Sequence, residues 1–172
     1  MWVYRKLTRA SGKYHEKLIG EELIYVENPP EILAEVRKVV SLILPQFDFN
    51  PFEQVFDDIL KLFAGNYPGY RKCNTLYHDL THTMDCLLVM ARLMHGAFVN
   101  GVNFTERDVN LGLISALMHD TGYIQTIDDD KGTGAKYTLT HIKRSMEFME
   151  KYFREHGFPV DSGRESPSPA RW

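Results

Sequence analysis

Two polar clusters inside otherwise apolar segments constrain this chain more than any other feature. The first lies in YHDLTHTMDC, residues 77–86, and the second in ALMHDTGY, residues 116–123. Ionisable side chains are costly to bury unless they are paired or bind a metal. The sequence therefore predicts a metal site assembled from two helices, with His82 on one helix and His119 and Asp120 at the end of the other.

The spacing within the first cluster predicts that its polar side chains share one pocket. His78 and His82 are four positions apart, and side chains four apart on a helix project from one face. Asp85 follows three positions later and falls on the same side. We expect His78 to open this helix, with its ring directed into the same pocket as the ring of His82.

Apolar residues recur at helical spacing along most of the chain, which predicts an all-α fold with about five main helices packed around the two motif helices. Proline, capping and glycine signals set the expected limits of these helices. The predicted segments are 29–44, 50–64, 77–95, 105–119 and one from a cap at Thr138 or Thr140 to Gly157. Residues 96–104, GAFVNGVNF, are expected to form a loop.

The distribution of apolar residues also predicts which faces are buried. In the helix ending near His95 they surround the axis almost completely, a pattern typical of a buried central helix. The helix that ends at His119 is expected to be buried too. For the last helix the predicted core stripe consists of Ile142, Met146, Met149 and Phe153.

Length and composition are those of one globular domain. The chain has 172 residues, of which 44% are hydrophobic and 25% are charged, values ordinary for a soluble fold. We expect an irregular N-terminal arm over residues 1–27, a helical domain over 28–157, and a flexible polar tail over 158–172, which is rich in serine and proline.

The net charge and the cysteine content indicate which partners and which cellular compartment this protein is expected to have. The formal net charge of −3 provides no basic footprint for nucleic acid. Cys73 and Cys86 form neither a CxxC pair nor a disulfide framework, which favours a reducing cytoplasm. No apolar run reaches the length of a membrane span, and no signal-peptide core is present, so we expect no membrane association.

The two clusters together resemble the HD superfamily of metal-dependent phosphohydrolases. The closest likeness is to the cyclic-nucleotide phosphodiesterase type, whose signature opens with Tyr-His and places a second histidine four residues later. The interval from His82 to His119 is close to the usual interval of that type, and the likeness covers roughly residues 75–155. It implies an HD-type helical bundle.

The resemblance implies roles for four residues. His82, His119 and Asp120 would bind a divalent metal, which could be Fe, Mn, Mg or Zn, because imidazole and carboxylate ligands alone do not select among these ions. His78 would be the general acid that protonates the leaving oxygen. The implied reaction is hydrolysis of a small phosphodiester or nucleotide by attack of metal-bound water.

Further residues match the family pattern or lie near it. Asp85 would be a carboxylate that supports the metal ligands without binding the metal itself. His141 resembles the additional histidine of members that hold two metals. The loop before the first cluster brings Arg71 and Lys72 close to His78. Two adjacent cations on a loop are usually just solvated, and the alternative is that one of them contacts a substrate phosphate.

The sequence departs from the family pattern at the last ligand. The family closes its metal site with an aspartate on a later helix, whereas Asp161 is the only aspartate after Asp130 and follows the last expected helix. The alternative reading is therefore a degenerate or shortened HD module that binds a ligand or another protein with little activity. A missing closing helix would expose an apolar groove, so we expect a homo-oligomer.

Overall fold

The computed structural model describes residues 28–158, which form five α-helices and two 3-10 helices without a β-strand. The expected all-α fold is therefore confirmed. The predicted arm over residues 1–27, most of the predicted tail and Asp161 lie outside the described residues. The α-helices are α1 (Pro29–Ile43), α2 (Asn50–Ala64), α3 (Leu80–Val99), α4 (Glu106–Met118) and α5 (His141–His156), and the 3-10 helices are η1 (Thr121–Tyr123) and η2 (Gly134–Tyr137).

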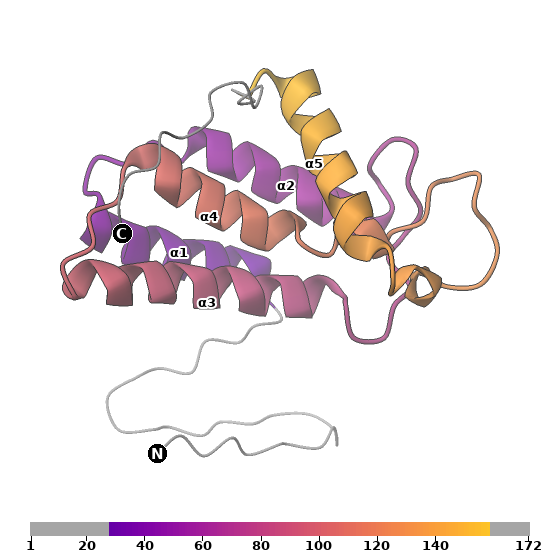
Figure 1. The fold of residues 1–172 in the computed structure, drawn as a ribbon, viewed down its shortest axis with the longest axis horizontal. Helices are drawn as coiled ribbons and strands as arrows, with labels where there is room; N and C mark the ends of the chain where they lie inside the picture. The colour runs from indigo at the N-terminus through magenta and orange to yellow at the C-terminus, as the bar shows by residue number, and fades with distance from the viewer. Residues whose placement is uncertain (1–27, 159–172) are drawn as a thin grey trace, which may run out of the picture.

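Helices α1 to α4 lie side by side and α5 crosses them steeply at one end (Figure 1). Helix α3 packs against α1 and α4, and α4 also packs against α2, whereas α5 contacts the bundle mainly through η1. The core between the four helices consists of large apolar side chains. Those with almost no exposed surface include Ile32, Phe52, Phe56, Ile59, Leu62, Met84, Leu87, Leu113, Ile114 and Leu117.

Local signals explain where several of these helices begin and end. Proline occupies the first turn of both α1 and α2, where its missing N–H group costs nothing. Helix α4 begins with a capping box, in which Thr105 and Asp108 exchange hydrogen bonds between side chain and backbone. Gly65 ends α2 with a φ of 79°, a conformation that favours glycine. The sequence predicted these boundaries correctly.

The limits of α3 differ from the prediction at both ends. The helix continues through Gly96 to Val99, because Asn100 Nδ2 donates a hydrogen bond of 2.7 Å to the Gly96 carbonyl and satisfies it at the helix end. At the other end, the Asp79 carboxylate accepts from the backbone N–H of His82 at 3.0 Å and caps the helix. His78 therefore lies before α3 instead of opening it, and that expectation was wrong.

The expectation that α3 is buried on all sides was also wrong. Val89 and Leu93 are 53% and 65% exposed. Helices α1 and α4 contact only part of the α3 surface, so one apolar strip of this helix faces outward among the described residues. The buried side chains of α3 are Thr83, Met84, Leu87, Leu88, Ala91 and Met94.

The predicted core stripe of α5 is correct only for Met149 and Phe153, which pack against the core. Ile142 and Met146 are 65% and 58% exposed, whereas Ser145, Phe148 and Tyr152 are buried. The reason is local hydrogen bonding, which the apolar periodicity does not report. The Ser145 hydroxyl bonds to backbone groups of the HDTGY segment and turns that side of α5 inward.

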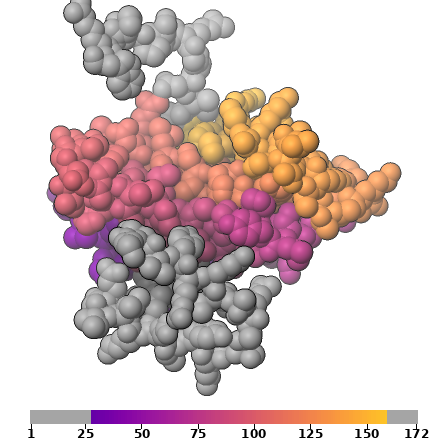
Figure 2. Space-filling view, turned by 60° about the horizontal axis from the view of Figure 1, so that its bottom comes forward, coloured from indigo at the N-terminus to yellow at the C-terminus, as the bar shows by residue number. Residues whose placement is uncertain are grey.

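Hydrogen bonds join two long loops at the end of the molecule that carries α5. The first loop, residues 65–79, connects α2 to α3, and the second, residues 124–133, connects η1 to η2. Asn74 donates to Gln125 Oε1 at 2.8 Å and accepts from the Gly134 N–H at 2.8 Å. Tyr70 and Thr126 form an isolated antiparallel bridge. In the space-filling view the orange atoms of the second loop form the right-hand end of the molecule, beside the yellow atoms of α5 (Figure 2).

Membrane insertion has no candidate segment in residues 28–158. None of the helices described there combines the length and the apolar character needed to span a bilayer.

Candidate metal centre

The buried carboxylate of Asp120 is the centre of a histidine cluster. Its Oδ2 atom lies 2.7 Å from His78 Nδ1, 3.0 Å from His119 Nε2 and 3.3 Å from His82 Nε2. His119 caps the C-terminal end of α4 and Asp120 follows it. The fold therefore brings together His78, His82, His119 and Asp120, as the sequence predicted, although His78 comes from a loop.

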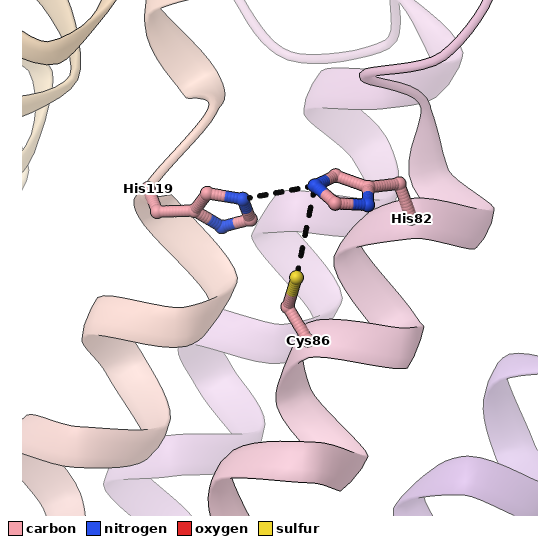
Figure 3. Close-up of side chains that lie close together, drawn as sticks. All are labelled: His82, Cys86 and His119. Carbon is pink, nitrogen blue, oxygen red and sulfur yellow. Dashed lines mark hydrogen bonds between the residues drawn. The ribbon is translucent and has the colours of Figure 1, made fainter. Parts of the chain in front are cut away.

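A backbone hydrogen bond of His119 determines which of its ring nitrogens faces the centre. His119 Nδ1 lies 2.9 Å from the Ala116 carbonyl oxygen, which can only accept, so this nitrogen carries the proton. Nε2 is then the nitrogen that faces the centre, 3.3 Å from His82 Nε2 across the gap between α3 and α4 (Figure 3). Such a hydrogen bond behind an imidazole is typical of metal-binding histidines.

His141 lies at the edge of the same cluster. It is the first residue of α5, and its Nδ1 donates to the Thr138 carbonyl oxygen at 2.8 Å. Its Nε2 is 3.9 Å from Asp120 Oδ1, on the other oxygen of the carboxylate. This separation is too long for a hydrogen bond, so His141 faces the centre without contacting it directly.

Tyr123 organises the histidines that come from outside the bundle. Its buried ring stacks on His78 at a centroid distance of 4.2 Å and on His141 at 4.5 Å, with interplanar angles of 14° and 20°. Sequence analysis missed this role, because stacking between residues far apart in the chain leaves no periodic signal.

The protonation state of the cluster follows from its contacts. Burial works to raise the pKa of Asp120, but hydrogen bonds from His119 and His78 outweigh it and lower that pKa to about 2. The hydrogen bond to Asp120 raises the pKa of His119. The Asp120 side chain is therefore a carboxylate at neutral pH, held by hydrogen bonds from His119 and His78.

The donor separations fit a metal ion. With metal–nitrogen and metal–oxygen bonds of about 2.1 Å, neighbouring donors stand about 3.0 Å apart in an octahedral site and about 3.4 Å apart in a tetrahedral one. The three separations among His82 Nε2, His119 Nε2 and Asp120 Oδ2 are 3.3, 3.0 and 3.3 Å. An ion among these atoms would replace the shared protons with little movement of the side chains.

Two overlapping sets of donor atoms occur here, and both include His82. In one set the other donors come from His78 and Asp120, and in the other from Cys86 and His119, with the donors of each set within 4.8 Å of one another. Cys86 was not among the predicted site residues. Its position four residues after His82 was the signal available, because that spacing places both side chains on one face of α3.

A groove of about 700 Å³ adjoins the centre and is open to the surface. Asp85 lines this groove near His82, consistent with the predicted common face, and burial raises the pKa of its carboxyl group. The role of Asp85 in supporting the metal ligands remains a prediction. The other lining residues are Tyr77, Cys86, Val89, Met90, Leu93, Ser115, Ala116 and His119.

The two loop cations considered as phosphate contacts differ in their surroundings. The Arg71 guanidinium donates to the Ile127 carbonyl oxygen at 3.1 Å from Nε and at 2.8 Å from Nη2. Arg71 therefore helps to hold the two long loops together. Lys72 is exposed, which agrees with the solvated alternative.

Contacts around Gly122 hold α5 against the centre. The Ser145 hydroxyl accepts from the Gly122 N–H at 2.9 Å and donates to the His119 carbonyl at 2.7 Å. Arg144 Nε donates to the Gly122 carbonyl at 2.7 Å. A Cβ atom on Gly122 would lie 2.0 Å from the His141 carbonyl oxygen, so only glycine permits this approach. These positioning residues were also absent from the sequence-based prediction.

Comparison with known proteins identifies a family. No curated protein sequence and no solved structure matches the chain. The model of the Npun_R2479-like family matches residues 49–158, a range that includes α2 to α5 and every residue of the histidine cluster. Since this range is more than half of the chain, the protein belongs to the Npun_R2479-like family.

Proposed function

We propose that this protein is a divalent-metal-dependent phosphohydrolase of the HD type, acting on a small phosphodiester or nucleotide. The observation that carries the proposal is the spacing of His82, His119 and Asp120, whose donor atoms stand 3.0–3.3 Å apart. When bound, a divalent cation lowers the pKa of a coordinated water and offsets charge on phosphoryl oxygens. The ligand types are compatible with Fe, Mn, Mg and Zn.

His78 is the proposed general acid. Its Nδ1 is engaged with Asp120 at 2.7 Å and its ring is stacked on Tyr123, so the orientation of the imidazole is fixed. Nε2 is then the nitrogen that gives a proton to the leaving oxygen. Histidine has an ordinary pKa near 6.5, which suits proton transfer around neutral pH.

The groove beside the centre is the proposed substrate entrance. It is lined partly by apolar side chains of α3, including Val89 and Leu93, which suits the organic part of a phosphate ester. The polar end of the groove is formed by His82, His119 and Asp85. A substrate lying in this groove would place its phosphate at the histidines and its apolar part along α3.

The test is turnover of a chromogenic phosphodiester by the purified protein with added manganese, iron, magnesium or zinc. We expect measurable hydrolysis that is lost in His119→Ala. In His78→Ala we expect the metal to remain and the rate to fall by about 10²–10⁴-fold. His95→Ala, a histidine on α3 outside the cluster, is the matched control and should keep the activity. Equal rates in the wild type and His119→Ala would contradict the proposal.

A second candidate is a ligand-binding or protein-interaction module with little activity. The specific observation is an exposed apolar stripe at the start of α5, formed by Leu139, Ile142 and Met146. Contiguous exposed apolar surface often marks an interaction site, and self-association through this stripe would give a homo-oligomer. Metal binding without turnover, together with a sedimentation mass above that of one chain, would favour this candidate.

The proposed compartment is the cytoplasm. Cys73 and Cys86 are both free thiols, as expected for a protein kept under reducing conditions. Comparison of the thiol content of protein isolated from cells with that of the reduced protein tests this assignment.

A further inference from the structure

We propose that Cys86 is a ligand of the metal together with His82 and His119. The centre would then prefer zinc over magnesium or manganese. This inference rests on the metal-binding part of the proposed function. It requires nothing about the substrate or the general acid.

The geometry of the sulfur atom carries the inference. Cys86 Sγ lies 3.7 Å from His82 Nε2, and the donor atoms of Cys86, His82 and His119 are all within 4.8 Å of one another. With bonds of about 2.3 Å to sulfur and about 2.1 Å to nitrogen, a tetrahedral zinc site separates these two donors by about 3.6 Å. Figure 3 shows the Cys86 side chain rising from α3 toward the His82 ring, with the His119 ring opposite.

The rigidity of the two helices supports the same assignment. Cys86 and His82 are one turn apart on α3, so their separation changes little when the rest of the site moves. His119 is held by the bond from its Nδ1 to the Ala116 carbonyl. The three donors are therefore preorganised without any contribution from the long loops or from α5.

The other cysteine provides an internal comparison. Cys73 Sγ has two oxygen neighbours, Thr75 Oγ1 at 3.3 Å and the His78 carbonyl at 3.4 Å, which account for it as a structural residue. Among residues 28–158, the polar contact of Cys86 Sγ is with a histidine nitrogen of the cluster. The two thiols thus differ in the surroundings that matter for metal binding.

The ligand chemistry predicts which ion is bound. Thiolate sulfur selects zinc and similar ions, whereas magnesium and manganese prefer oxygen donors. Binding deprotonates the Cys86 thiol and releases the proton to solvent. Three protein donors leave a further position for Asp120 or a water molecule, as in catalytic zinc sites with three protein ligands.

Cobalt(II) titration of the full chain tests the inference directly, because a cobalt–thiolate bond gives a charge-transfer band in the near ultraviolet. We expect this band in the wild type and in Cys73→Ser, the matched control. In Cys86→Ser we expect cobalt to bind through the histidines without the band. We also expect zinc affinity to fall by more than about 100-fold, beyond the loss typical when a residue behind the ligands is removed.

Three outcomes separate the failure modes. Cobalt binding to the wild type without the thiolate band would overturn the role of Cys86 and leave the proposed metal site intact. No binding of cobalt or zinc to the wild type would overturn both proposals. Loss of the band in Cys73→Ser would mean that Cys73, and not Cys86, is the sulfur ligand, and would overturn the inference. The wild-type and Cys73→Ser spectra decide the question even if Cys86→Ser fails to fold.

Discussion

Apolar burial holds the four-helix bundle, whereas α5 combines the burial of Phe148 and Tyr152 with directional hydrogen bonds at its first turns. Helices α1 to α4 meet through fully buried apolar side chains such as Phe56 and Leu113. At the first turns of α5, the Ser145 hydroxyl accepts from the Gly122 N–H and donates to the His119 carbonyl, and Arg144 donates to the Gly122 carbonyl. Hydrophobic burial is non-directional, whereas these hydrogen bonds require one orientation of α5.

The candidate centre spans both regions, which gives this difference a functional consequence. His82, His119 and Asp120 belong to the ends of α3 and α4 in the bundle. His78 comes from a loop and His141 from α5. We therefore expect the metal-binding part of the site to persist when α5 is loosened, and the arrangement of the two outer histidines around Tyr123 to be lost.

The largest effect is expected from opening a cavity in the bundle. Phe56→Ala removes a ring that is almost completely buried between the helices, and such changes lower the free energy of unfolding by about 3–5 kcal/mol. All helices should lose protection together in hydrogen exchange, because the bundle is the common core. Leu42→Ala, at an exposed position of α1, is the control and should change stability by less than about 0.5 kcal/mol. Comparable losses in both variants would contradict this description of the core.

Gly122→Ala should separate the two regions. The added Cβ would collide with the His141 carbonyl oxygen, and relief requires α5 to move away from η1, at a cost of about 3 kcal/mol. Hydrogen exchange should increase in α5 while α1 to α4 stay protected. Gly96→Ala on α3 is the matched control, because open space surrounds that position, and it should stabilise the protein by about 0.5–1 kcal/mol. Unchanged protection of α5 in Gly122→Ala would disprove the close approach.

Ser145→Ala should produce a smaller form of the same effect. The change removes the acceptor of the Gly122 N–H and the donor to the His119 carbonyl, and buried groups left without partners cost about 1–3 kcal/mol. Chemical denaturation followed by far-ultraviolet circular dichroism measures the loss. Met146→Ala, at the next and exposed position of α5, serves as the control. A larger loss in Met146→Ala would mean that the apolar stripe, and not Ser145, holds the helix.

The smallest expected effect concerns pH and the far end of α5. The Asp58 carboxylate of α2 accepts from Tyr152 Oη at 2.9 Å and from Lys61 Nζ at 2.7 Å. Burial works to raise the pKa of Asp58, but these hydrogen bonds lower it overall. A folded-state pKa below the unfolded value contributes stability above the unfolded pKa, near 4, and this contribution is lost as pH falls through the folded value.

Asp58→Asn should therefore show a weaker loss of stability between about pH 5 and pH 3 than the wild type. Thermal denaturation at a series of pH values measures this slope. Asp57→Asn, at the neighbouring exposed position, should retain the wild-type slope. A steeper acid loss in Asp58→Asn would mean that the carboxylate is not stabilised in the folded protein.

Sequence periodicity predicted the bundle well because burial alone organises it. Most apolar positions of α1, α2 and α4 are buried, with Leu42 and Leu111 as exposed exceptions, and proline and capping signals lie at the starts of these helices. The same reasoning failed for α5, where Ile142 and Met146 are exposed and Ser145 is buried. A hydrogen-bonded serine in an interface counts as polar in any apolar pattern, so periodicity was wrong for the first turns of α5 and correct for Met149 and Phe153, which pack against the core.

The candidate site was predictable where its residues follow helical spacing or a known motif. His82, His119 and Asp120 were found in this way. Tyr123 and Gly122 were not, because stacking and close backbone approach depend on tertiary geometry. Cys86 could have been found from its spacing to His82, since both face the same groove.

The central claim is that His82, His119 and Asp120 bind a divalent metal, and metal content tests it most directly. Elemental analysis of freshly purified protein, and of protein soaked in each of Fe, Mn, Mg and Zn, should find stoichiometric binding of at least one ion. His119→Ala and Asp120→Ala should lose the ion, whereas Ser145→Ala should keep it, because the Ser145 hydroxyl bonds to backbone groups and not to the side chains that bind the ion. Absence of stoichiometric binding in every condition, or retention of the ion in both His119→Ala and Asp120→Ala, would contradict the claim.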